Sequence, residues 1–159
     1  MKKTVLFSSL TIAVIILLSS CTINKKNDSS TTNTPSIIGT WKLISGMIIE
    51  GDDTVFTDYT KNQEMIKIIN KSHFAFLKHD LKNGKDSNAN FESGGGKYYL
   101  KEGKYIEHLE YCNTREWENN TFEFEYSING DTLTTKGIEE ITELDINQII
   151  IEKYVRATK

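Results

Sequence analysis

An alternating run in residues 121–128 constrains the fold of this chain most strongly, because every second side chain there is apolar. A β-strand turns successive side chains to opposite faces, so the run predicts a half-buried antiparallel strand. Asn129-Gly130 follows and suits a type I′ hairpin turn, after which residues 132–136 return as the partner strand. The inward face of the first strand is Phe122, Phe124, Tyr126 and Ile128.

Two more hairpins are predicted from the turn residues Asn70-Lys71 and Glu102-Gly103. A last strand is expected at residues 146–156, an exposed loop at 82–90, and a loop or one acidic helical turn at 137–145. No convincing helix interrupts the series, so we predict an all-β antiparallel meander barrel of about eight to ten strands. The strands expected around the two turns are residues 65–69 and 72–77, and residues 97–100 and 104–111.

Three consecutive glycines, Gly94-Gly95-Gly96, admit two interpretations. Backbone amides without side chains can approach an anion closely, as in phosphate-binding loops. No strand-to-helix unit surrounds these glycines, and no Lys-Ser or Lys-Thr pair follows them. A bulge or sharp bend at the start of a barrel strand is therefore the favoured interpretation.

The N-terminus combines a basic start, Met1-Lys2-Lys3, with an apolar run at residues 5–18 and then Ser19-Ser20-Cys21. The run is short for a membrane-spanning helix and fits a secretory signal. The pattern ending at Cys21 resembles the lipobox of bacterial lipoproteins. The resemblance implies a signal peptide at residues 1–20 and acylation of Cys21, which would attach the chain to a membrane. The alternative is an ordinary secretory signal whose cysteine is accidental.

Residues 21–36 are polar, contain the only proline and predict a flexible tether before a domain at residues 37–159. Thr22 follows Cys21 where an acidic residue would, in some Gram-negative sorting systems, hold a lipoprotein at the inner membrane. We therefore expect a cell-envelope protein at the outer membrane. Asn24-Lys25-Lys26-Asn27 also lacks the acidic run that some lipoproteins carry for display at the cell surface, so we expect the periplasmic face.

Composition narrows the range of partners. The formal net charge is −3, and basic and acidic residues are interspersed, so no basic stripe for nucleic acid exists. The chain has two cysteines, and if Cys21 carries lipid then Cys112 has no partner for an intramolecular disulfide. Cys112 is interpreted as a small buried apolar residue. One domain of this size predicts one core, and a monomer is favoured.

Gly39-Thr40-Trp41 and Arg156 carry a second resemblance. The triplet matches the G-x-W signature on the first barrel strand of the lipocalins, and Arg156 stands where that family places an arginine over the tryptophan. The resemblance implies that Gly39, Trp41 and Arg156 are structural residues. A guanidinium on an indole face makes a cation–π contact that also covers the ring.

Three further blocks, residues 72–76, 94–98 and 105–111, are similar to the small lipocalin-like domains of secreted and lipid-anchored bacterial proteins. That similarity implies a fold and only a generic ligand-binding activity. Thr57-Asp58-Tyr59 matches a triplet of longer lipocalins but falls too early in the chain, so we treat it as coincidence.

Glu107 is the central residue of the predicted binding site. In an extended strand it shares one face with Tyr105, Leu109 and Tyr111, and a carboxylate among aromatic rings suits a cationic or hydroxylated ligand. The alternative is that the tyrosines form core and Glu107 pairs with a lysine at the barrel mouth. This alternative is favoured because acidic side chains are seldom fully buried. The candidate ligand-binding residues are Phe76, Glu107, Tyr111, Phe124 and Tyr126.

Catalytic and metal motifs are missing from the sequence. The three histidines, His73, His79 and His108, show no metal-ligand spacing, and no nucleophile-base arrangement stands out. We therefore predict no catalytic residue, no metal, no cofactor and no enzymatic activity.

Two functions remain in view. The first is a lipid-anchored barrel that binds a small apolar or amphipathic ligand. The second is a packed barrel without a ligand that binds a protein partner in the envelope, with an exposed Trp117 as its anchor. The alternative for Trp117 is that its side chain folds back over the barrel mouth.

Overall fold

The computed structural model describes residues 36–85, 87 and 89–157. The predicted signal peptide, Cys21 and all of the predicted tether except Ser36 lie outside the described residues. No helix within the described ranges is long and apolar enough to cross a membrane.

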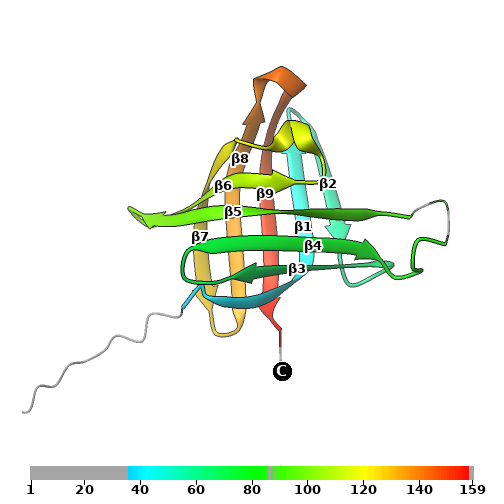
Figure 1. Cartoon of the computed structure of the whole chain (residues 1–159), viewed down its shortest axis with the longest axis horizontal. Coiled ribbons are helices and arrows are strands. Elements are labelled where there is room, and N and C mark those ends of the chain that lie inside the picture. The colour runs from blue at the N-terminus through cyan, green and yellow to red at the C-terminus, as the bar shows by residue number, and fades with distance from the viewer. Residues whose placement is uncertain (1–35, 86, 88, 158–159) are drawn as a thin grey trace, which may run out of the picture. The chain divides into compact units, whose positions relative to one another are not determined.

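Nine strands and two three-residue 3₁₀ turns make up this described part of the chain. The strands run in chain order, with η1 between β6 and β7 and η2 between β8 and β9 (Figure 1). Their bounds are β1 Gly39–Glu50, β2 Asp53–Asp58, β3 Gln63–Ile69, β4 His73–Asp80, β5 Phe91–Lys101, β6 Lys104–Cys112, η1 Arg115–Trp117, β7 Thr121–Asn129, β8 Thr132–Ile141, η2 Thr142–Leu144 and β9 Ile146–Arg156.

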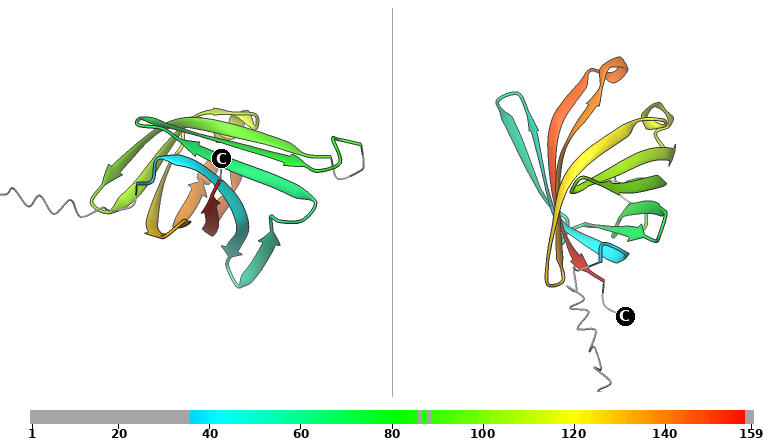
Figure 2. Two further views of the ribbon diagram at one scale, coloured as in Figure 1. Left: turned by 90° about the horizontal axis from the view of Figure 1, so that it is seen from below. Right: turned by 90° about the vertical axis from the view of Figure 1, so that its left-hand side faces the viewer.

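The strands form a closed antiparallel barrel of eight strands with one extra strand. Strands β3 to β9 pair with their neighbours in sequence, and β9 returns to pair with β1. The first residues of β1 also pair with β3, and its last residues pair with β2, the extra strand. In Figure 1 β3 to β6 cross in front of β7, β8, β9 and β1, and Figure 2 shows the two curved layers from other sides. The predicted all-β meander barrel is confirmed.

One predicted hairpin turn agrees with the structure, and another differs from it in detail. Glu102 and Gly103 both have positive φ, 52° and 78°, as a two-residue type I′ turn requires. The type I′ turn predicted at Asn129-Gly130 is wrong in detail. Asn129 pairs with Thr132 as the last residue of β7, which leaves Gly130 and Asp131 in the turn, and only Gly130 has positive φ, 57°.

The glycine triplet lies inside β5, opposite a bulge in β6. Gly95 pairs with Tyr111 and Gly96 with Leu109, so Glu110 has no partner in the ladder. A side chain on these glycines would collide with the neighbouring strands, and a Cβ at Gly94 would lie 2.6 Å from the Phe76 ring. The prediction is therefore right in part: a bulge occurs at the glycines, but its extra residue lies on β6, and β5 begins before the glycines and not at them.

Two other expectations need correction. Residues 137–141 continue strand β8, and the helical turn is confined to η2. Strand β2 was not anticipated, because it has no alternating pattern and its first four residues are exposed. Its main stabilising contact is the ladder with β1, which no local signal in its own sequence indicates.

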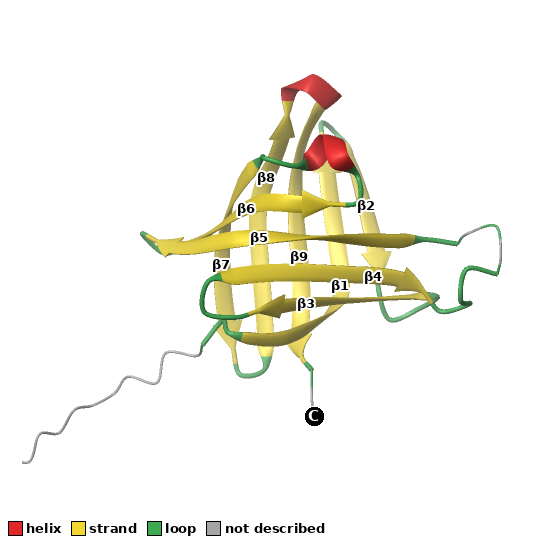
Figure 3. Ribbon diagram, viewed as in Figure 1, coloured by secondary structure: helices red, strands yellow, loops and turns green. Residues whose placement is uncertain are grey.

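One end of the barrel, formed around Gly39, Trp41 and Arg156, is here called the Trp41 end. The Trp41 side chain is fully buried, and its Nε1 donates to the Ile37 carbonyl at 2.7 Å. The Arg156 guanidinium lies 4.1 Å from the Trp41 ring centroid, and a Cβ on Gly39 would lie 2.5 Å from Arg156 Nη1. The predicted stacking of Arg156 on Trp41 is confirmed, and η1 and η2 lie at the opposite end (Figure 3).

Candidate ligand-binding cavity

A cavity of about 380 Å³ lies among inward-facing side chains, and Trp117 of η1 is part of its wall. Trp41 is not part of the wall, so the cavity is separate from the Trp41 end. Alternation along the strands explains the lining, because every second residue of β3, β6 and β9 faces inward. The apolar wall includes Met65, Phe76, Leu109, Phe122, Phe124 and Ile150.

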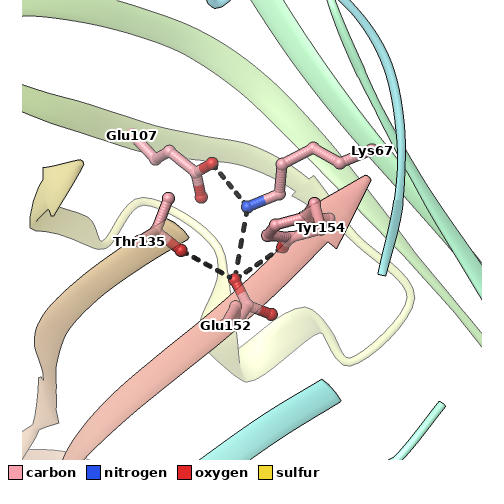
Figure 4. A network of polar contacts seen from close by, with 5 residues as sticks. All are labelled: Lys67, Glu107, Thr135, Glu152 and Tyr154. Atoms are coloured by element: carbon pink, nitrogen blue, oxygen red, sulfur yellow. Dashed lines mark hydrogen bonds and ion pairs between the residues drawn. The ribbon is translucent and has the colours of Figure 1, made fainter. Parts of the chain in front are cut away.

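A buried ion-pair network forms the floor of the cavity (Figure 4). The Lys67 Nζ lies 2.9 Å from Glu107 Oε1 and 3.7 Å from Glu152 Oε2. Glu152 Oε2 also accepts hydrogen bonds from the Tyr154 hydroxyl at 2.6 Å and from Thr135 Oγ1 at 3.5 Å. The three charged side chains are only 5%, 8% and 12% exposed, so the network is held away from solvent.

Aromatic rings surround the Lys67 ammonium, which lies 5.4–5.9 Å from the ring centroids of Phe74, Tyr105, Phe124 and Tyr154. Burial alone disfavours a charged amine, but the charges of Glu107 and Glu152 outweigh burial and raise the pKa of Lys67 above its usual value. Lys67 is therefore a fixed positive charge and not a nucleophilic amine.

Glu139 on β8 adds a further carboxylate to the cavity wall. Burial, together with the nearby charges of Glu152 and Glu107, raises its pKa to about 7, although a 2.7 Å hydrogen bond from Gln148 Nε2 acts in the opposite direction. Within the described ranges Glu139 has no ion-pair partner. Its charge therefore changes near neutral pH.

The turn η1 packs over one side of the cavity. Trp117 packs on Phe122 with ring centroids 6.0 Å apart, and both rings line the cavity. Glu118 Oε1 accepts a hydrogen bond from the Cys112 amide at 2.9 Å, and Glu118 Oε2 pairs with Arg115 at 2.9 Å. Of the two alternatives for Trp117, the structure shows the second, because the indole is half-buried and folds back onto the barrel.

The predicted ligand-binding residues separate into three groups. Phe76, Glu107 and Phe124 line the cavity. Tyr126 packs on Tyr105 at 6.5 Å between ring centroids, but it is not part of the cavity wall. The expectation that Tyr111 faces inward is wrong, because the bulge at Glu110 reverses the alternation and leaves Tyr111 69% exposed.

Several cavity residues escaped the sequence analysis, above all Lys67, Glu139 and Glu152. A signal for Lys67 existed, because it shares strand parity with the buried residues Met65 and Ile69. Pairing of Glu107 with a lysine was the alternative interpretation, but the identity of that lysine was not readable from the sequence, since Lys67 lies 40 residues away. Cys112 is free and partly buried, and it also lines the cavity.

The fold and the cavity together define a small antiparallel barrel with an internal polar network and room for a ligand. A scan of protein-family models finds no family that matches this chain, and a search of curated proteins finds no similar one. Among the described residues no group of three or more His, Cys, Asp or Glu side chains is placed to hold a metal ion.

Proposed function

We propose that this chain is a lipid-anchored lipoprotein of the cell envelope, with a lipocalin-like barrel that binds a small amphipathic molecule and catalyses no reaction. The observation that supports binding most directly is the cavity of about 380 Å³. Ligand pockets commonly measure about 300–1,000 Å³, and this volume corresponds to about a dozen water molecules at about 30 Å³ each. The ligand is therefore small.

The wall supports an amphipathic ligand and not a purely apolar one. Phe122, Phe124 and Leu109 supply apolar surface, whereas Glu107, Glu139 and Glu152 supply carboxylates. Pockets that combine apolar walls with a few fixed polar groups orient their ligands through those groups. A single cavity with both kinds of surface fits a molecule with an apolar body and a polar head.

Anchoring rests on the sequence pattern around Cys21. Acylation there would attach the barrel to a membrane through the tether, which spans on the order of 20 Å if it behaves as a random coil. Replacing Cys21 with Ser is expected to release the barrel from the membrane or to block normal processing. Unchanged membrane retention with normal cleavage would contradict the anchor. The outer membrane, on its periplasmic face, is the proposed location.

A cavity-filling pair of variants tests ligand binding. Ile150→Trp places an indole in the cavity, whereas Ile149→Trp on the same strand adds the same bulk to the outer face. Calorimetric titration of the full-length protein in nonionic detergent uses 2-phenylethylamine, 2-phenylethanol and 3-phenylpropionate as probes. We expect at least one probe to bind the parent protein and Ile149→Trp but not Ile150→Trp. Binding of none, or equal binding by Ile150→Trp, would overturn the proposed function.

A further inference from the structure

We propose that the ligand is an organic cation, an amine or ammonium compound whose charged head lies beside Glu139 and Glu152 and whose apolar body lies against Phe122 and Phe124. This inference rests on the proposed function, since it assigns a chemical class to the ligand of the same cavity. It follows from the charges that face the cavity, from their existing partners and from the adjoining apolar wall.

Acidic groups outnumber basic groups around the cavity. Four described carboxylates line it, against two described ammonium groups. At one part of the wall Lys78 pairs with Glu92 at 2.8 Å, and on the floor Lys67 pairs with Glu107 at 2.9 Å. Glu152 shares Lys67 with Glu107 through a longer contact of 3.7 Å, and Glu139 has no ion-pair partner among the described residues. Glu139 and Glu152 are therefore the cavity carboxylates whose charge is least compensated.

Both carboxylates lie on the inward face of the β8–β9 ladder, and the charge of Glu152 acts on Glu139. Glu139 pairs in the β8–β9 ladder with Gln148, and Glu152 pairs with Thr135. Because Gln148, Ile150 and Glu152 alternate along β9, their side chains share the inward face. Glu152 has hydrogen-bond donors in Tyr154 and Thr135, whereas the donor to Glu139 is the neutral amide of Gln148.

An anionic ligand would meet repulsion from the same groups. Lys67, the only buried cation among the described residues, already contacts Glu107 and Glu152 and is enclosed by four aromatic rings. A bound anion would therefore have carboxylates as neighbours without gaining a free positive partner. A bound ammonium gains Glu139 and Glu152 as neighbours, and attraction between opposite charges is strong where water is displaced.

The ionisation of Glu139 follows from its neighbours on every adjoining element. It faces the neutral Gln148 and the acidic Glu152 on β9, Glu107 on β6 and the cation of Lys67 on β3, and Tyr59 after β2 also lies within electrostatic range. Burial and the two carboxylates raise the pKa of Glu139 to about 7. A bound cation favours its ionised form, so affinity for the cation is highest above pH 7 and falls on acidification.

The three probes of the cavity test differ in charge and share a phenyl-ethyl body. At pH 8 we expect 2-phenylethylamine to bind at least about tenfold more tightly than 2-phenylethanol, with 3-phenylpropionate the weakest. The amine affinity is expected to fall between pH 8 and pH 6. If the alcohol or the carboxylate binds as tightly as the amine, the cationic ligand is wrong while ligand binding stands. If no probe binds, the proposed function itself fails.

Two matched variants locate the charge. Glu139→Gln removes the cavity carboxylate, and Glu140→Gln removes the next side chain, which is exposed on the outer face of the same strand. We expect Glu139→Gln to weaken amine binding about tenfold, to leave the alcohol unchanged and to flatten the pH dependence. Glu140→Gln is expected to match the parent protein. Equal effects of both variants, or no effect of Glu139→Gln, would overturn the assignment.

Discussion

Both the Trp41 end and the cavity floor place a cation on aromatic rings, but they balance its charge differently. Arg156 is about one third exposed and donates to the carbonyls of Ser36 and Ile38. Lys67 is 5% exposed and depends on Glu107 and Glu152 for compensation. At the Trp41 end solvent and the exposed Asp131, 3.8 Å from Arg156 Nε, compensate the charge, whereas in the cavity buried carboxylates compensate it. The same type of contact therefore covers a ring at one end of the barrel and forms part of a charged surface in the cavity.

The largest effect expected from this comparison is at Lys67. Lys67→Met leaves Glu107 and Glu152 buried without their cation, so we expect a loss of about 3–5 kcal/mol in the free energy of unfolding at pH 7. Urea denaturation at pH 7 measures this loss. Lys104→Met, which breaks an exposed pair with Glu125, is the control and is expected to change little.

A smaller effect is expected from Glu139, whose pKa is raised from 4.5 to about 7 in the folded protein. The folded state then binds more protons than the unfolded state between these two values, so stability falls as pH rises through that window. We expect Glu139→Gln to remove most of this fall and to add roughly 2 kcal/mol above pH 7. Thermal denaturation from pH 4 to pH 8 tests it, and an unchanged slope would contradict the assignment.

The smallest effect is expected at the Trp41 end. Arg156→Lys replaces a planar guanidinium with an ammonium that cannot cover the Trp41 ring in the same way, so we expect a loss of about 1 kcal/mol. Arg115→Lys in the exposed turn η1 is expected to have no measurable effect. A loss above 3 kcal/mol in Arg156→Lys would show that the Trp41 end depends on its cation as strongly as the cavity floor does.

Local patterns predicted much of this fold. Alternation in β7 and the turn residues Glu102 and Gly103 led directly to observed elements, because period and backbone φ are properties of a few consecutive residues. The Trp41–Arg156 contact was predicted through resemblance, and the ladder between β1 and β9 provides it. The prediction that Tyr111 faces inward was wrong, because one bulged residue reverses which side of the strand faces the core.

The sequence by itself determined an antiparallel series of strands, its principal turns and the alternation that separates core from surface. Only the tertiary structure decided that Lys67, Glu107 and Glu152 meet, and that Glu139 faces the same cavity. The physical reason is that strand periodicity is local, whereas charge compensation depends on which strands become neighbours when the barrel closes. Apart from Glu107, no local sequence pattern marks any of these residues as part of a site. The proposed ligand chemistry depends on the strand pairing that brings them together.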